Sequence, residues 1–402
     1  MKKFNKVLSV VVASAMVMAM AGCGNTDNGS AATGTNAATE SAAADNGAAS
    51  GSVFKIGGIG PTTGGAAVYG LAVQHGAEIA VEEINAAGGI NGYQVEFKFQ
   101  DDEADAEKSV NAYNALKDWG AQIIDGSTTS GACIAVTDKT KEDNMFQITP
   151  SGSAVECVQY DNNFRVCFSN PNQGLASAQY IGENGLAEKI AVIYDSSDVY
   201  SSGIYEKFVK EAENQPFEVV AAEAFTADNK TDFSVQLQKA KDAGADMVFL
   251  PIYYQESALI LTQAAAMGYA PKWFSCDGMD GILGGVDNFD VSLTEGVMLL
   301  TPFAADATDD LTQSFVTKYK EKYGETPNQF AADSYDAIYV IKAAIEKSGV
   351  TPDMSVSDIC DGMKAAMTEI TVDGLTGNGM TWTADGEANK APKAVVIENG
   401  AY

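Results

Sequence analysis

Short apolar runs and longer amphipathic stretches alternate along most of the chain. The apolar runs have the length of strands, and the longer stretches carry apolar residues at helical spacing and end at glycine. Strands are expected at 53–58, 94–100, 123–126, 145–148, 189–194, 219–225, 247–251 and 273–276. Helices are expected to end at Ala87 and to span 104–119, 131–142, 201–213, 233–243 and 256–267. Such alternation predicts an α/β fold with parallel sheets between helices, and its two series predict two doubly wound lobes.

The last third continues this pattern without starting a third domain. Apolar residues recur every four positions from Leu311 to Tyr323, which predicts a helix that ends at Gly324. Further helices are expected at 330–348 and 357–367, and strand-like pieces at 379–383 and 394–397. These elements are too few for another lobe, so the chain is expected to cross between the two lobes more than once.

The N-terminus has the pattern of an export signal. A basic start, Lys2 to Lys6, precedes an apolar run that is too short to span a membrane comfortably. The ending Met20-Ala21-Gly22-Cys23 resembles a bacterial lipobox, which implies that residues 1–22 are removed and that Cys23 carries a lipid. The alternative is an ordinary cleaved signal. Residues 24–52 are small and polar, so we expect a disordered tether.

The charge excludes two classes of partner. The chain has 25 Lys and Arg against 54 Asp and Glu. Such a surface repels phosphate backbones and anionic lipid, so nucleic-acid binding is not expected. No later segment is apolar enough to span a bilayer, and any contact with the membrane is expected through the N-terminal lipid alone.

Five further cysteines follow Cys23: Cys133, Cys157, Cys167, Cys276 and Cys360. In an exported chain they are open to oxidation. Cys157 and Cys167 are the pair close in sequence, and they are either joined by a disulfide or free. The chain has no Cys-x-x-Cys and no Cys/His cluster, so no metal site is expected.

The motifs of enzymes are missing. The single histidine, His75, lies in the middle of a predicted helix, and no serine stands in a Gly-x-Ser-x-Gly elbow. Gly58-Ile59-Gly60 follows a strand, but Pro61 and the missing third glycine speak against a dinucleotide loop. Asp101 and Asp102 follow a strand and precede a helix, so we expect them to cap the helix or to lie in solvent. We therefore expect no enzyme and no cofactor.

Hydroxyl-rich loops follow three of the predicted strands. Their positions are 61–65, 127–131 and 149–153, at the carboxyl ends of strands, where ligands bind in open α/β sheets. Hydroxyls and free backbone N–H groups at a helix start can hold an anion such as a carboxylate. The alternative is that these residues only cap helices and form turns.

A second group of residues offers the complementary chemistry. Asp277 follows the strand at 273–276, where a carboxylate inside a cleft can pair with an ammonium group. Aromatic side chains with a polar tip suit the walls of a small-molecule pocket, and tyrosines fall at Tyr69, Tyr200, Tyr253 and Tyr254. A turn at Asp277-Gly278 and simple packing of the tyrosines are the alternatives.

From residue 53 to the end, the chain resembles the branched-chain amino acid binding proteins of ABC transporters. The resemblance is carried by segments in the family's order: KIGGIGPTTGGAAVYG, AVEEINAAGGINGYQVEF, ITPSGSA, FRVCFSNPNQG, IAVIYDSSDVYSSG and YKEKYGETPNQFAADSYDAI. It implies two Rossmann-like lobes, built from residues 53–168 with 302–380 and from residues 169–301 with 381–402. The implied crossings lie near Phe168, Thr301-Pro302 and Thr381, with the ligand cleft between the lobes.

The resemblance also implies roles for individual residues. Positions matching Ser130, Ser151 and Ser153 hold the ligand's α-carboxylate, and the position matching Asp277 holds its α-ammonium. Positions matching Tyr69, Tyr200 and Tyr253 lie at the walls or mouth of the cleft. This sequence departs from the family at two points. Thr129 stands where some members end a disulfide, and Asp277 is shorter than the frequent glutamate.

The implied function is that of a monomeric solute-binding lipoprotein, held at the outer face of the bacterial membrane, that delivers an amino acid to permease subunits. Branched-chain amino acids are the first expectation, followed by other neutral or aromatic ones. An amide or small carboxylate ligand and a sensor protein of the same fold remain as alternatives. The end of the sequence at Tyr402 without a spanning segment disfavours a receptor ectodomain.

Overall fold

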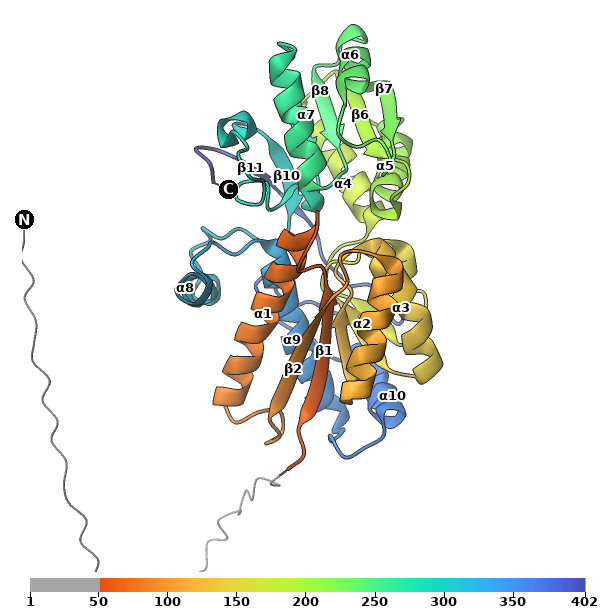
Figure 1. The fold of residues 1–402 in the computed structure, drawn as a ribbon, viewed down its shortest axis with the longest axis vertical. Coiled ribbons are helices and arrows are strands. Elements are labelled where there is room, and N and C mark those ends of the chain that lie inside the picture. The colour runs from red at the N-terminus through yellow and green to blue at the C-terminus, as the bar shows by residue number, and fades with distance from the viewer. Residues whose placement is uncertain (1–50, 402) are drawn as a thin grey trace, which may run out of the picture. The chain divides into compact units, whose positions relative to one another are not determined.

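The computed structural model describes residues 51–401. The predicted signal peptide at 1–22, Cys23 and most of the 23–52 tether lie outside the described residues. Two sheets organise the rest of the chain, and each forms the centre of one lobe (Figure 1). The predicted two-lobed α/β fold is therefore confirmed. No helix between residues 51 and 401 has the length and apolar character needed to cross a membrane.

The first lobe is built on a parallel sheet with strand order β2-β1-β3-β4-β5. Its strands are β1 (Phe54–Gly60), β2 (Val95–Asp101), β3 (Ile123–Gly126), β4 (Phe146–Thr149) and β5 (Asn163–Arg165). The inner strands β3 and β4 are buried at every position, as parallel strands between helices are, although they also carry the polar residues Asp125, Gln147 and Thr149.

Six helices belong to the first lobe: α1 (Ala67–Ala86), α2 (Ala106–Trp119), α3 (Ser130–Asp143), α8 (Asp310–Tyr323), α9 (Gln329–Ser348) and α10 (Val356–Met367). Figure 1 shows α1 and α9 on one side of the strands and α2 and α3 on the other. Helix α2 is delimited by local chemistry. The Asp105 side chain accepts a hydrogen bond from Lys108 N at its start, and Gly120, at φ 94°, ends it.

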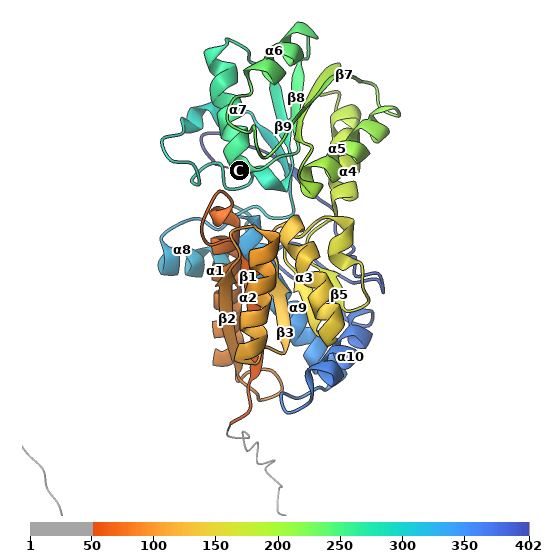
Figure 2. The same ribbon diagram turned by 45° about the vertical axis from the view of Figure 1, so that its right-hand side comes forward.

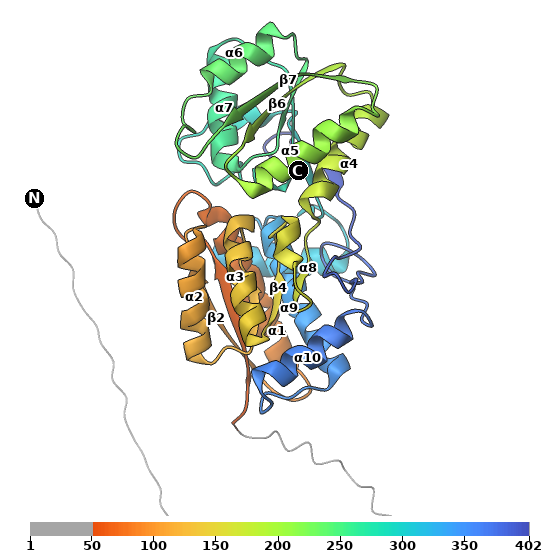
Figure 3. The ribbon, with the colours of Figure 1, turned by 90° about the vertical axis from the view of Figure 1, so that its right-hand side faces the viewer.

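The second lobe has six strands in the order β11-β10-β9-β8-β6-β7. They are β6 (Lys189–Asp195), β7 (Glu218–Phe225), β8 (Met247–Leu250), β9 (Lys272–Ser275), β10 (Met298–Thr301) and β11 (Lys393–Val396). Only β11 runs antiparallel to its neighbour. Its helices are α4 (Asn170–Glu183), α5 (Val199–Ala212), α6 (Ser234–Asp242) and α7 (Tyr254–Ala266). Figures 2 and 3 show α6 and α7 apart from α4 and α5, with strands between the pairs.

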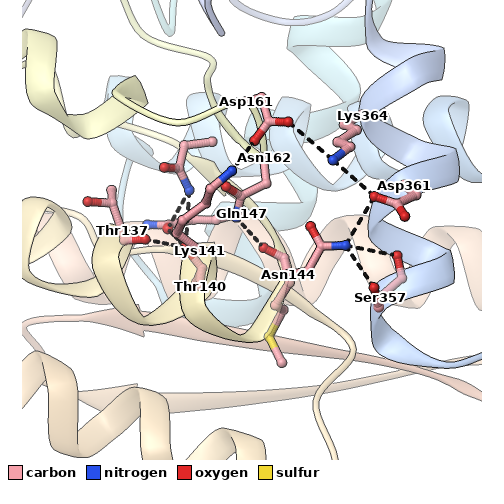
Figure 4. Close-up of polar contacts among 12 residues, drawn as sticks. Thr137, Thr140, Lys141, Asn144, Gln147, Asp161, Asn162, Ser357, Asp361 and Lys364 are labelled. Carbon is pink, nitrogen blue, oxygen red and sulfur yellow. Dashed lines mark hydrogen bonds and ion pairs between the residues drawn. The ribbon is translucent and has the colours of Figure 1, made fainter.

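Polar contacts fix the late helix α10 on the first lobe (Figure 4). Asn144, which follows α3, donates hydrogen bonds to Ser357 Oγ at 2.8 Å and to Asp361 Oδ1 at 3.0 Å. Lys364 pairs with Asp161 at 3.2 Å. Residues more than two hundred positions apart thus share one lobe, because the chain returns from the second lobe before α8.

The three crossings between the lobes follow from the lobe to which each strand and helix belongs. The chain leaves the first lobe between β5 and α4, returns between β10 and α8, and leaves again before β11. The crossing predicted at Thr381 is wrong, because residues after it still cover the edge strand β5. Trp382 Nε1 donates to Arg165 O at 2.8 Å, and Arg165 N donates to Gly386 O at 3.1 Å. Lys390 Nζ still reaches Asp333 of α9 at 2.7 Å.

The strands β5 and β10, the helix α4 and the short 3₁₀ helices were not predicted from the sequence. The strand β5 has only three residues and no alternation that would reveal it. Residues 379–383, which were expected as a strand, form isolated bridges instead, from Val372 to Met380 and from Trp382 to Ala388.

Candidate functional site

A cavity of about 20 Å³ lies where loops of the two lobes meet. It is lined by Tyr69, Thr128, Thr129, Ser130, Ser151, Tyr200, Tyr253, Asp277, Gly278 and Phe330. This volume holds about one water molecule, so the lobes must move apart before a small-molecule ligand can enter. The structure brings six of the seven predicted ligand-binding residues to its walls. The seventh, Ser153, is fully buried behind them.

The first-lobe wall is a helix N-terminus. Helix α3 begins at Ser130, directly after the loop that follows β3, and its N-cap residue Thr129 makes no capping hydrogen bond with its side chain. The first backbone N–H groups of a helix have no partner within the helix, and they carry the positive end of its dipole. This wall therefore favours a negatively charged group.

Hydrogen bonds to its oxygen orient the Ser130 hydroxyl. Its oxygen accepts hydrogen bonds from Ser153 N and Ala154 N, both at 3.1 Å. Because the oxygen is occupied as an acceptor, the Ser130 hydroxyl hydrogen is left to donate. The contacts also join the loop after β4 to the start of α3, so both hydroxyl loops form one wall.

Other hydroxyls in this wall differ in how they are satisfied. Ser151 Oγ donates to Thr128 O at 2.6 Å. The Thr129 Oγ1 and Ser153 Oγ atoms are buried and make no hydrogen bond to the described residues. A buried hydroxyl without a partner is costly, so Thr129, which lines the cavity, is a further candidate for a ligand contact.

A buried carboxylate faces this wall from the second lobe. Asp277 follows β9 and is 4% exposed. Its Oδ1 accepts from Tyr200 OH at 2.7 Å, and its Oδ2 accepts from Gln173 Nε2 at 2.9 Å. Burial raises the pKa of Asp277 to about 7, although the Tyr200 hydrogen bond works in the opposite direction. Asp333 adds a smaller like-charge effect that also raises this pKa.

Aromatic rings complete the walls. The Tyr69 ring packs on Phe330 with centroids 4.4 Å apart and meets Tyr253 edge-on at 5.5 Å. Tyr253 in turn stacks on Tyr200 at 5.0 Å. The rings supply apolar surface, and the tyrosine hydroxyls bind protein groups around them.

Hydrogen bonds between the lobes surround the cavity. Tyr69, on α1 of the first lobe, donates to Gly278 O of the second lobe and accepts from Tyr254 N at 3.1 Å. Gln329, at the start of α9, donates through Nε2 to Asp277 O at 3.1 Å and through its backbone N to Asp280 Oδ2 at 2.9 Å. The contacts of Tyr69 and Gln329 thus hold both walls of the cavity together.

A buried cation supports the first-lobe wall from behind. Arg165 is fully buried, and its guanidinium donates to Gly152 O at 3.2 Å and Ala154 O at 2.9 Å. It also lies 3.3 Å from the Glu387 carboxylate. Arg165 thereby fixes the loop that presents Ser151 and Ser153.

Several of these residues are only weakly indicated by the sequence. Gln173 lies on α4, a helix that was not predicted, although its segment SNPNQG was among those that carried the family resemblance. Phe330 was noticed only as the start of a helix. Arg165 stands beside apolar residues, but nothing in the sequence shows that its guanidinium points inward to two carbonyls.

Other residues considered from the sequence make packing or turn contacts outside the cavity. His75 is half-buried and stacks on Tyr323 with centroids 3.6 Å apart. Asp101 accepts hydrogen bonds from Thr62 N and Thr63 Oγ1, and Tyr254 lies beside the cavity without lining it. Within residues 51–401, no three His, Cys, Asp or Glu residues are grouped to hold a metal ion.

The possible disulfide between Cys157 and Cys167 is not present in this structure, where all five cysteines of residues 51–401 are free thiols. The strand β5 lies between them and takes Cys167 away toward the charges of Arg165 and Asp333. Cys157 packs instead in a small buried cluster with Cys133 and Ala154.

Comparison with known proteins agrees with this geometry. Residues 53–401 match the periplasmic binding protein family. The chain belongs to this family, whose members act outside the cytoplasm. A Leu/Ile/Val-binding protein homologue of Brucella melitensis is 31% identical over 300 residues, which cover 74% of this chain and 80% of the relative. A leucine-, isoleucine-, valine-, threonine- and alanine-binding protein of Pseudomonas aeruginosa is 30% identical over 74% of this chain and 79% of its own.

A solved structure supports the same assignment. The substrate-binding protein LivJ of a branched-chain amino acid transporter from Streptococcus pneumoniae, in complex with isoleucine, superposes with a TM-score of 0.78. It is 28% identical, and the match covers 87% of this chain and 97% of that one. The expected family, that of the substrate-binding proteins of branched-chain amino acid ABC transporters, is confirmed.

Proposed function

We propose that this protein binds a neutral L-amino acid, with branched-chain amino acids first, and delivers it to the permease of an ABC transporter. One observation carries the proposal. A helix N-terminus with a donating hydroxyl faces a buried carboxylate across a small cavity, and these are the partners of a carboxylate and of an ammonium group.

The ligand's carboxylate is assigned to the first lobe. The Ser130 hydroxyl hydrogen, the free N–H groups of the first turn of α3 and the unpaired Thr129 hydroxyl all offer donors there. Ser151 is placed beside them, whereas Ser153 contributes from behind by holding Ser130 through its backbone N–H. No basic side chain is required, because the helix dipole and several neutral donors share the charge.

The ligand's ammonium is assigned to Asp277. Both oxygens of Asp277 already accept one hydrogen bond from a neutral donor, and each retains a second acceptor position. A cation placed there compensates the buried charge. The aromatic walls of Tyr69, Tyr253 and Phe330 offer apolar surface to an aliphatic side chain, in keeping with the ligands named for the relatives.

Delivery depends on movement of the lobes. The contacts of Tyr69 and Gln329 join the two lobes around the cavity, so they must break for a ligand to enter. A ligand that touches both walls favours the closed form, and the permease is expected to recognise that form. We place the protein outside the cell membrane as a monomer, held by a lipid on Cys23 after removal of residues 1–22, with 23–52 as its tether.

A thermal-shift screen of the full chain tests the proposal against the protein amino acids and a set of amides and carboxylic acids without an amine. A ligand at a hundred times its Kd stabilises the folded state by about 2.7 kcal/mol, which raises Tm measurably. A shift with leucine, isoleucine or valine is the expected result. The proposal would be refuted if no amino acid raised Tm while an amine-free acid such as benzoate, or an amide, did.

A further inference from the structure

Two buried cysteines lie directly behind the carboxylate-binding wall. Cys133 is in the first turn of α3, and Cys157 is in the short 3₁₀ helix Val155–Val158 that follows the loop of Ser151 and Ser153. Both side chains are fully buried, and together with Ala154 they form a cluster separate from the larger cores. The Cys157 thiol donates to Ser130 O, three residues before Cys133 in the same helix.

The surroundings of the two thiols are unequal. The neighbouring Cys157 thiol, helped by Thr149 and by the charge of Arg165, lowers the pKa of the Cys133 thiol. Burial raises the pKa of Cys157 well above its ordinary value. In the folded chain Cys133 is therefore the thiol of the pair that loses its proton more readily.

Other contacts connect the pair to the site. Cys157 Sγ lies 3.7 Å from Ser130 O, and Gln147 Nε2 donates to Cys133 Sγ at 3.6 Å. Figure 4 shows Gln147 among the polar side chains that hold α3 against β4. A covalent bond at this point would join the start of α3 to the loop after β4, which are the two segments that build the carboxylate-binding wall.

We propose that Cys133 and Cys157, which are free thiols in this structure, form a disulfide in the exported protein. The bond forms by exchange with an oxidised dithiol oxidant: one thiolate attacks the oxidant's disulfide, and the second cysteine displaces the oxidant from the mixed disulfide. The two cysteines lose two protons and two electrons, and the oxidant's disulfide is reduced to two thiols. Because both thiols are buried in the folded chain, the exchange takes place during folding outside the cytoplasm.

The cross-link has two consequences. It closes a loop between positions 133 and 157, which restricts the unfolded chain and stabilises the fold. It also holds Ser130 in register with Ser153 and Ala154, whose N–H groups bind its oxygen. The second consequence rests on the proposed function, whereas the bond itself does not.

Peptide mapping of the full chain tests the bond. The protein is purified from the cell envelope without reductant, denatured, treated with iodoacetamide, digested and analysed by mass spectrometry without reduction. A peptide pair joined through Cys133 and Cys157 is expected, with Cys167, Cys276 and Cys360 alkylated. Alkylation of both Cys133 and Cys157, also after refolding with oxidised glutathione, would overturn the proposal. A bond from Cys157 to Cys167 would overturn it as well.

Reduction provides a functional test with a matched control. Dithiothreitol is expected to lower the Tm of the wild-type protein by about 5–10 °C and to weaken leucine binding. The double variant Cys133→Ser, Cys157→Ser should no longer respond to the reductant, whereas Cys167→Ser should respond like the wild type. An unchanged Tm of the wild type would contradict the stabilising role. If leucine does not bind at all, peptide mapping still decides the bond separately from the proposed ligand.

Discussion

The phenolic oxygen of Tyr200 donates a hydrogen bond to Asp277 Oδ1 at 2.7 Å, and the same oxygen accepts one from Gly278 N at 2.9 Å. Tyr200 therefore fixes the Asp277 carboxylate without neutralising it. The second partner of this carboxylate, Gln173, is also neutral. A buried carboxylate with neutral partners favours the arrival of a cation, and the ammonium group of an amino acid supplies one.

Removing the charge of Asp277 tests its role. Asp277→Asn keeps the size of the side chain but cannot pair with an ammonium group, so leucine affinity should fall by about 2–5 kcal/mol. Isothermal titration calorimetry measures the change. Asp125→Asn is a matched control, because Asp125 is equally buried but binds Ser334 away from the cavity. Equal losses in both variants would show a general effect on the fold and not a loss of the ligand's partner.

The pH dependence of binding follows from the raised pKa of Asp277, about 7. Below that pH the carboxyl group is protonated in the enclosed, ligand-free state and must lose its proton before it pairs with the ligand. The dissociation constant for leucine should therefore increase as the pH falls below about 7, by up to about tenfold per unit. Titrations between pH 5 and pH 8 measure this slope. The slope should be absent in Asp277→Asn, and a slope that persists there would assign the proton to another group.

The same raised pKa has the opposite effect on the protein without ligand. Protonated Asp277 stabilises the folded state fully below the ordinary pKa of 3.8, and this contribution is lost as the pH rises through about 7. Ligand-free Asp277→Asn should therefore gain stability over the wild type at neutral pH. Urea unfolding at pH 7 gives the comparison, and a less stable variant there would speak against the raised pKa.

Tyr69 connects the lobes, so its hydroxyl should control ligand release. Tyr69→Phe loses the contacts with Gly278 O and Tyr254 N, and we expect a loss of about 1 kcal/mol in affinity, seen mainly as faster dissociation. Stopped-flow displacement measures the dissociation rate. Tyr113→Phe is the control, since its hydroxyl binds Asp143 within the first lobe at 2.7 Å. An unchanged rate in Tyr69→Phe would remove this contact from the closure mechanism.

Arg165 supports the carboxylate-binding wall and should matter for stability and affinity together. Arg165→Met leaves the carbonyls of Gly152 and Ala154 without a donor, so the free energy of unfolding should fall by about 2–4 kcal/mol. Leucine affinity should fall too, because the loop of Ser151 loosens. Urea unfolding and calorimetry measure the two effects. Lys141→Met breaks an exposed ion pair with Asp161 instead and should cost less than about 1 kcal/mol.

The sequence predicted those site residues whose place depends only on their position relative to the end of a strand. Ser130, Ser151 and Asp277 lie in or just after the loops that follow strands, and the carboxyl ends of parallel strands meet at one edge of a sheet. Their positions along the chain were therefore enough to expect them at the cleft. The tyrosines were named for their chemistry, and Tyr69, Tyr200 and Tyr253 line the cavity.

Residues whose role depends on contacts with other elements of the fold could not be predicted from their position in the sequence. Gln173 reaches Asp277 from a helix that shows no clear apolar spacing, and Arg165 is buried by chain segments that arrive two hundred residues later. The crossing after Lys390 and the partner of Cys157 belong to the same class. In each case the deciding contact joins separate elements of the fold, and sequence spacing carries no record of it.

The central claim is that the cavity recognises the carboxylate and the ammonium of one ligand together. Calorimetric titration of the full chain at pH 7.5 with leucine, and with the acid that lacks only leucine's amine, tests it most directly. We predict that leucine binds and that the amine-free acid binds at least about thirtyfold more weakly, since Asp277 would stay unpaired. Equal affinity for the two ligands would contradict the account.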